Sequence, residues 1–159
     1  MNGLQDSATH AHEQARAHQR AHALPSILLV EDDQDIRDTL RMAFEDEGYV
    51  VLEAEDGIAA LNLLRKSMAP LVVTLDLRMP RLNGDALLQH VSKREHLPAQ
   101  HAYLLITANR ELLSPASLRL LKRMDVLVVS KPFDLNDLLD LVAHAADALD
   151  SPGAASPEQ

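Results

Sequence analysis

Several polar side chains stand directly after short apolar runs, where they could form one reactive site. In chain order these groups are Glu31-Asp32-Asp33, Asp76, Thr107 and Ser130-Lys131. Carboxylates held within a few ångströms repel one another unless a proton or a cation lies between them. Oxygen ligands with no Cys or His nearby favour a hard cation such as Mg²⁺. An aspartate, a divalent ion, a lysine and a hydroxyl together indicate a phosphoryl-transfer site.

These side chains can meet only if the apolar runs are strands of one sheet. The predicted strands are Ser26–Val30, Tyr49–Glu53, Leu71–Leu75, His101–Ile106 and Val126–Val129. Segments with apolar residues at helical spacing lie between and after them. The predicted helices are Asp35–Glu47, Gly57–Met68, Asp85–Arg94, one that opens at Ser114-Pro115 and one capped by Asp134.

Five strands that alternate with five helices predict an α/β fold with a doubly wound parallel sheet. Four of the strands are continuous apolar runs, which is typical of strands buried on both faces. In the strand order 2-1-3-4-5, strands one and three flank the crevice in which such sheets bind ligands. Among the helix residues, we expect Ile58, Met68 and Leu118 to lie on core-facing sides.

Composition excludes several classes of function. The 159 residues include 15 basic and 24 acidic side chains, for a formal net charge of −9, which argues against nucleic acid or an anionic membrane as the direct partner. There is no Cys, so disulfides, thiolate zinc sites and cysteine nucleophiles are excluded. No apolar run reaches the roughly 18 to 20 residues of a membrane span, and no signal peptide is recognisable. A cytoplasmic protein is therefore expected.

The chain divides into three parts. Residues 1–24 form a His- and Ala-rich extension, expected to be flexible or helical, and residues 151–159 have the Pro, Gly, Ser and Ala composition of a disordered tail. Residues 25–150 contain no linker-like break, so we expect them to form one domain.

Four segments of that domain resemble the receiver domain of two-component response regulators. They are ILLVEDD at strand one, LVVTLDLRMPRLNG at strand three, LLITA at strand four and VVSKPF at strand five. The resemblance covers about residues 26–149, with all four motifs in the family's order. It implies a flavodoxin-like (βα)₅ fold and a stand-alone regulator, because only about ten residues follow the last predicted helix.

The resemblance assigns roles to four residues around a bound ion. Asp76 resembles the aspartate that accepts a phosphoryl group from a sensor histidine kinase or a phosphotransfer protein. Asp32 and Asp33 resemble the acidic pair that binds Mg²⁺, with Asp33 as the more direct ligand. Asp76 itself and the backbone carbonyl of Arg78 complete the expected protein ligands.

Two further residues are implied to respond to the phosphoryl group, and one position departs from the family. Thr107 resembles the switch hydroxyl, and Lys131 resembles the lysine that pairs with a phosphoryl oxygen and typically precedes a cis Pro132. The family usually has Tyr or Phe three residues before this lysine. Val128 stands there instead, which puts the common aromatic switch in doubt.

The implied output is a protein contact through the face formed by the fourth helix, the fifth strand and the fifth helix. A homodimer is left open, and no direct nucleic-acid or membrane contact is expected. One alternative is a binding module with a receiver fold that works without phosphorylation. Another is an aspartyl-phosphate enzyme of the haloacid-dehalogenase type, although that chemistry needs an acid/base aspartate where Arg78 stands.

Overall fold

The computed structural model describes residues 23–94 and 97–151, so the predictions for residues 1–22 and 152–159 lie outside it. The strands are β1 (Ser26–Val30), β2 (Val51–Ala54), β3 (Leu71–Asp76), β4 (Ala102–Thr107) and β5 (Leu127–Ser130). The helices are α2 (Gln34–Asp46), α3 (Gly57–Lys66), α4 (Gly84–Ser92), α5 (Leu97–Gln100), the 3-10 helix η1 (Arg110–Leu112), α6 (Pro115–Arg123) and α7 (Leu135–Asp150). None of these helices is long and apolar enough to cross a membrane.

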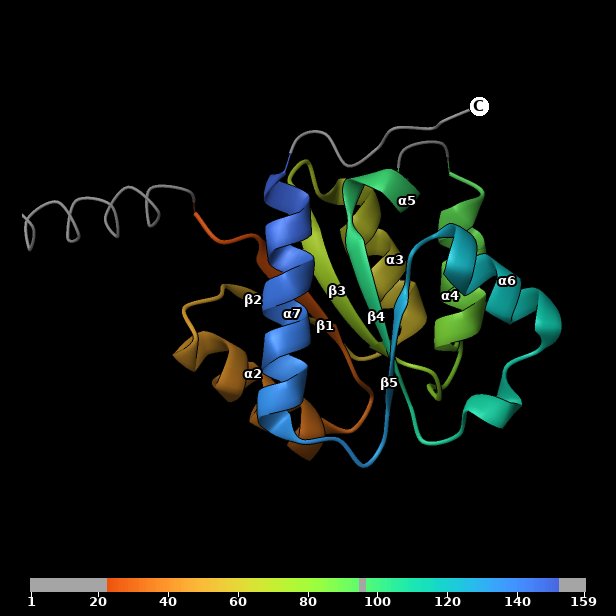
Figure 1. Ribbon diagram of the computed structural model, residues 1–159, viewed down its shortest axis with the longest axis horizontal. Helices are drawn as coiled ribbons and strands as arrows, with labels where there is room; N and C mark the ends of the chain where they lie inside the picture. The colour runs from red at the N-terminus through yellow and green to blue at the C-terminus, as the bar shows by residue number, and fades with distance from the viewer. Residues whose placement is uncertain (1–22, 95–96, 152–159) are drawn as a thin grey trace, which may run out of the picture.

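The five strands form one parallel sheet in the order β2-β1-β3-β4-β5, which confirms the predicted fold class (Figure 1). Val30 pairs with Leu75 at the ends of β1 and β3, and Thr107 pairs with Ser130 at the ends of β4 and β5. All strands therefore end at the same edge. The residues that follow them are brought to that edge together.

Helices cover both faces of the sheet, and each face has its own apolar core (Figure 1). On one face, α2 and α7 bury Phe44 and Val142 against alternate strand residues such as Ile27. On the other face, α3, α4 and α6 bury Leu64 and Leu88 against the intervening residues. This double burial explains why β1, β3 and β4 are apolar without alternation.

A polar residue caps each of the five longer helices at its start. The capping residues, whose side chains accept a backbone N–H of the first turn, are Asp33, Asp56, Asn83, Ser114 and Asp134. Such caps satisfy amide groups that have no partner within the helix. Each helix begins at the edge where a strand has just ended. Helix capping therefore accounts for some of the polar residues at this edge of the sheet.

Some details differ from the sequence-based expectations. The segments α5 and η1 were not predicted, and α3 ends at Lys66, so Met68 lies beyond it and is 96% exposed. Ile58 and Leu118 are each 50% exposed, which contradicts their expected place in the core. In α6 the buried residues are Ser117, Leu120 and Leu121, so a serine lies beside two leucines on the face that packs against the core.

Candidate functional site

The strand ends bring the expected residues to one edge of the sheet. Glu31 and Asp32 follow β1, and Asp76 ends the neighbouring strand β3. Thr107 ends β4, and Lys131 follows β5, with the Lys131 amide donating to the Thr107 carbonyl at 2.8 Å. Strand order alone therefore places acidic residues over β1 and β3, and the hydroxyl and ammonium groups over β4 and β5.

Three carboxylates converge at the ends of β1 and β3. Oxygen atoms of Glu31, Asp32 and Asp76 all lie within 4.8 Å of one another. Glu31 is only 3% exposed. Its pKa is raised to about 7, mainly by burial and also by the negative charges of Asp76 and Asp32, although the Asp33 amide and Lys131 oppose the shift. Negative charge is therefore costly at this point unless a cation approaches it.

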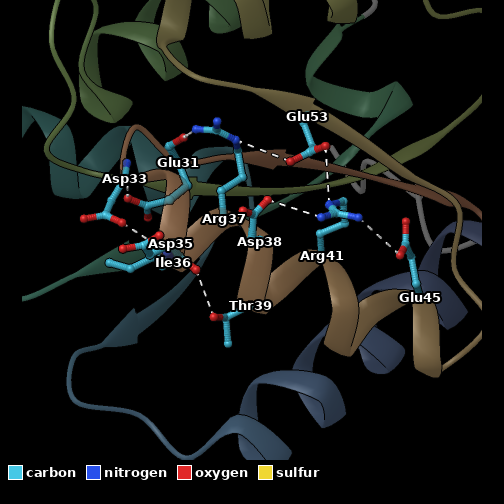
Figure 2. A network of polar contacts seen from close by, with 10 residues as sticks. All are labelled: Glu31, Asp33, Asp35, Ile36, Arg37, Asp38, Thr39, Arg41, Glu45 and Glu53. Atoms are coloured by element: carbon cyan, nitrogen blue, oxygen red, sulfur yellow. Dashed lines mark hydrogen bonds and ion pairs between the residues drawn. The ribbon is translucent and has the colours of Figure 1, made fainter.

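Asp33 has another role in the structure. Its carboxylate accepts the Ile36 amide at 3.1 Å and caps α2, while its own amide donates to Glu31 Oε1 at 3.2 Å (Figure 2). The three-carboxylate group contains Glu31, which was not an expected ligand, and does not contain Asp33, which was. The expected acidic pair is thus displaced by one residue, because the helix begins at Gln34 and uses the preceding aspartate as its cap.

The turn that presents Glu31 is fixed from the side of α2 (Figure 2). Arg37 donates from Nη1 to the Glu31 carbonyl at 2.8 Å, and its Nε lies 3.4 Å from Glu53 on β2. The Arg37 side chain is 16% exposed, so this contact is partly shielded from solvent. A guanidinium group thereby links the acidic turn to the edge strand of the sheet.

Each carboxylate oxygen of Asp76 has a donor. The Arg78 amide donates to Oδ1 at 3.3 Å, and Lys131 Nζ lies 3.4 Å from Oδ2. The Asp76 side chain is 12% exposed and that of Lys131 is 29% exposed. Asp76 is thus an oriented but still accessible carboxylate between an acidic group and an ammonium group.

Thr107 lies beside this site but its hydroxyl is engaged elsewhere. The residue is 2% exposed, and its Oγ1 accepts the Asn109 amide at 3.1 Å. The Lys131–Pro132 peptide bond is cis, as the resemblance implied. The structure therefore brings Lys131 onto Asp76 directly and places Thr107 on the adjacent strand end.

Val128 occupies the position at which the family usually has an aromatic residue. Val128 is half-buried and packs against the core shared by α3, α4 and α6. Its carbonyl accepts a hydrogen bond from Arg110 Nη2 at 3.1 Å. A side chain from η1 thus connects the segment after β4 with the edge strand β5.

A cleft of about 490 Å³ opens beside the acidic group. Its polar lining comes from Asp32, Arg78, Asn83 and Asp85. Apolar residues after β3 and around η1 complete the wall: Leu77, Met79, Pro80, Leu112 and Leu113. The cleft therefore lies between the β3–α4 and β4–α6 segments, beside Asp32 and the residues that follow Asp76.

The donor chemistry of the acidic group fits Mg²⁺. Its three side chains offer only carboxylate oxygens, from two neighbouring strand ends, within a span that one ion can bridge. Burial is the main reason for the raised pKa of Glu31, and the charges of Asp76 and Asp32 add to it, so a cation bound here would favour the ionised carboxylate.

Comparison with known proteins agrees with this geometry. A family model described as the response regulator receiver domain matches residues 27–143. The chain belongs to this family. Receiver domains are signalling modules of two-component systems, so the family assignment places the chain in that class of signalling protein.

Relatives and solved structures show the same likeness. The chain is 37% identical over 112 residues to the uncharacterized transcriptional regulatory protein YrkP of Bacillus subtilis, covering 70% of this chain and 45% of that protein. It is 38% identical over 117 residues to the Regulator of RpoS of Escherichia coli, covering 73% and 33% respectively. The receiver domain of the Francisella response regulator 1452 has a TM-score of 0.65 at 26% identity, covering 78% of this chain and 98% of that one.

A CheY-like receiver domain protein from Methanospirillum hungatei has a TM-score of 0.68 at 23% identity, covering 79% of this chain and 97% of that one, which supports the fold. The chain spans only a third to somewhat more than half of the length of the first relatives. The likeness therefore concerns the receiver domain and not the remaining parts of these longer proteins.

Proposed function

We propose that this protein is a cytoplasmic phosphoacceptor that receives a phosphoryl group on Asp76 from a sensor histidine kinase or a phosphotransfer protein. One observation carries the proposal. The Asp76 carboxylate lies within 4.8 Å of two other carboxylates and within 3.4 Å of Lys131 Nζ. An aspartate placed between an acidic group and a lysine is suited to become an acyl phosphate and to have its charge balanced.

The transfer needs few groups from the protein. An oxygen of Asp76 forms a bond to phosphorus while the bond from phosphorus to the donor's imidazole nitrogen breaks, and that nitrogen keeps the electron pair and takes a proton. The Arg78 amide holds one oxygen of Asp76, which leaves the other oriented toward Lys131. Lys131 then pairs with an oxygen of the phosphoryl group, and Thr107, which follows the β4 residue paired with Asp76, would be a second donor.

Glu31, Asp32 and Asp76, with the backbone carbonyl of Arg78, would hold Mg²⁺. When bound, this ion supplies positive charge that balances the carboxylates and the phosphoryl oxygens. Asp33 is replaced in this assignment by Glu31 because the Asp33 carboxylate caps α2. Of these ligands, Glu31 is buried and would be held in place by its surroundings, whereas Asp32 is exposed to solvent.

The output we propose is a protein contact through the face formed by α6, β5 and α7 (Figure 1). Strand β5 is the edge strand on the side of the sheet opposite β2, and helices on opposite faces of the sheet flank it. Phosphorylation adds about 1.5 to 2 negative charges next to the residues that begin this face. A kinase or phosphotransfer protein and a downstream target are therefore the partners to seek.

A second candidate is a binding module that works without phosphorylation. Val128 favours it, because a valine has little surface to bury differently when Thr107 moves. In that case the acidic edge is a binding surface and Asp76 is one of its charges.

Acetyl phosphate with Mg²⁺ separates the two. We expect the wild type to gain the mass of one phosphoryl group, and Asp76→Asn to gain none. Asp140→Asn, an exposed aspartate on α7, is the matched control and should gain the same mass as the wild type. A folded wild type that gains no mass from acetyl phosphate or from a phosphorylated donor domain contradicts the phosphoacceptor proposal and favours the module.

A further inference from the structure

The loop that follows the phosphoacceptor contains a residue in an unfavourable backbone conformation. Arg81, between β3 and α4, has φ of +66°. Residues with a Cβ adopt this left-handed region at a cost, and they keep it where surrounding contacts require it. The contact at Arg81 is an ion pair, since its Nη2 lies 2.8 Å from Asp56 Oδ2.

Asp56 is prepared to receive this guanidinium group. Its side chain is 6% exposed, and its Oδ1 already accepts the Ala59 amide at 2.8 Å as the cap of α3. Arg81 provides the partner of the second oxygen, so both oxygens of a buried carboxylate are paired. Glu55 adds a second negative charge 3.6 Å from Arg81 Nη2.

The backbones of the two turns also touch next to this pair. A Cβ placed on Gly57 would lie 2.3 Å from the Leu82 carbonyl oxygen, so the turn before α3 and the loop after β3 meet with no room for a side chain. Arg81 and Leu82 are therefore held against one fixed turn, by charge and by close packing.

The same loop contacts the phosphoacceptor at its other end. The Arg78 amide donates to Asp76 Oδ1 at 3.3 Å. The Leu77 amide donates to the Ile106 carbonyl and the Gly84 amide to the Leu77 carbonyl, so both ends of residues 77–84 are tied to the sheet. What remains adjustable is the middle of the loop, and Arg81 fixes that part.

We propose that Arg81 is a positioning residue for the reaction at Asp76. Through its ion pair with Asp56 it holds residues 78–82 so that the Arg78 backbone stays on the acceptor carboxylate. This inference rests on the proposed function, and it names a residue that sets the rate of phosphorylation and the affinity for Mg²⁺ without touching the reacting atoms.

The test uses Arg81→Gly, which removes the ion pair and also relieves the left-handed strain. A residue with a purely structural role would lose activity only as far as it loses stability. We expect the melting temperature of Arg81→Gly to change little, because relief of the left-handed strain offsets the lost donor to Asp56. The rate of phosphorylation by acetyl phosphate should nevertheless fall about 10-fold or more, because a displacement near 1 Å can cost as much as 10²-fold. Magnesium affinity, measured calorimetrically with the metal alone, should fall with it.

Two variants and one spectroscopic readout complete the design. Arg81→Lys keeps a cation near Asp56 and should recover most of the rate, whereas Arg65→Ala removes an exposed arginine in the last turn of α3 and should change nothing. In metal-free protein, the NMR resonance of the Arg78 backbone amide should shift in Arg81→Gly but not in the other two variants.

Comparing the wild type with Arg81→Gly separates failure of this inference from failure of the proposed function. If the wild type is not phosphorylated, the proposed function fails first and this inference fails with it. If the wild type is phosphorylated and Arg81→Gly matches its rate and its magnesium affinity, the inference alone is overturned. A loss of rate in Arg81→Gly that merely follows a fall in melting temperature overturns it as well.

Discussion

At the scale of single residues, His101 is a titratable group that the phosphoryl chemistry does not use. It is 4% exposed at the start of β4, and its Nδ1 accepts the Leu71 amide of β3 at 3.0 Å. Burial lowers its pKa to about 4. The folded protein therefore needs this imidazole neutral, because a proton on Nδ1 would remove the hydrogen bond and place a charge in the core.

We expect stability to depend on pH through His101. Between about pH 6.5 and 4 the unfolded chain binds a proton at this residue and the folded chain does not, so the free energy of unfolding falls as the pH falls. The full difference is as much as about 3 kcal/mol. His101→Asn can still accept the Leu71 amide but cannot titrate. Denaturant unfolding of both proteins across this range, without metal, should show the loss in the wild type relative to the variant.

The comparison with His101→Asn is needed because Glu31 titrates in the same range with the opposite effect. Its raised pKa makes the folded chain bind a proton that the unfolded chain has lost. Groups other than His101 contribute equally to both proteins and cancel in the difference. Parallel pH curves for the two proteins would contradict the role given to His101.

The places of several polar residues at this edge of the sheet could be predicted from the sequence. Polar residues after apolar runs located Asp32, Asp76 and Lys131, because parallel strands share one carboxyl edge. The prediction named Asp33 and left out Glu31, whereas the structure groups Glu31 with Asp32 and Asp76 and uses Asp33 as the cap of α2. The signal was present, since an aspartate three residues before Ile36 also fits an N-cap.

At the scale of elements, a buried polar contact joins α4 to α6. Ser117 Oγ lies 2.8 Å from Asp85 Oδ2, and Ser117 is 3% exposed. Ser114, the cap of α6, lies 2.8 Å from the same hydroxyl. Among the described residues, Asp85 Oδ1 is buried with no hydrogen-bond partner. Asp85 Oδ2 also accepts Gln89 Nε2, but at 3.3 Å and in an exposed contact. The link is therefore asymmetric, because without its partner Ser117 keeps a short bond to Ser114, while Asp85 keeps the longer, exposed one.

This asymmetry predicts an unequal double-mutant cycle. Ser117→Ala leaves the Asp85 carboxylate short of a donor in a shielded place and should cost about 1–3 kcal/mol of the free energy of unfolding. Asp85→Leu leaves Ser117 bonded to Ser114 and should cost much less. In the Asp85→Leu background, Ser117→Ala should then be nearly neutral, which chemical denaturation can measure. Equal and additive costs would show that the contact is not coupled.

The sheet was easier to predict than the helix faces, for a physical reason. Strands buried on both sides leave continuous apolar runs, so all five strands were found. Helix faces depend on which side meets the sheet, and apolar residues such as Ile58 and Leu118 lie on the solvent side. Ser117 is buried because Asp85 receives its hydroxyl, a pairing 32 residues apart that periodicity does not reveal.

At the scale of the whole molecule, charge and topology act together. The chain has a formal net charge of −9, and the strand order concentrates three carboxylates at one edge of the sheet. Lys131 lies 3.4 Å from one oxygen of this group and provides a single positive charge against three carboxylates. Folding therefore assembles like charges that the unfolded chain keeps apart, and this cost should appear as a dependence of stability on divalent cations.

Magnesium should stabilise the fold, and removal of a ligand should abolish this effect. At a tenfold excess over its dissociation constant, an ion that binds only the folded state adds about 1.4 kcal/mol, or roughly 3 to 6 °C in melting temperature. In chelator, Glu31→Gln and Asp32→Asn should melt above the wild type, because each relieves repulsion. With MgCl₂ both should lose the increase. Sodium chloride at equal ionic strength is the control for screening.

Asp33→Asn tests the assignment of the acidic group most directly. Asparagine caps helices as well as aspartate does, so this variant should fold normally. Because the Asp33 carboxylate serves α2 and not the three-carboxylate group, its response to MgCl₂ should equal that of the wild type. If Asp33→Asn abolishes the response and Glu31→Gln retains it, the ion is held by Asp32 and Asp33, and the arrangement of carboxylates at this edge must change when the metal binds.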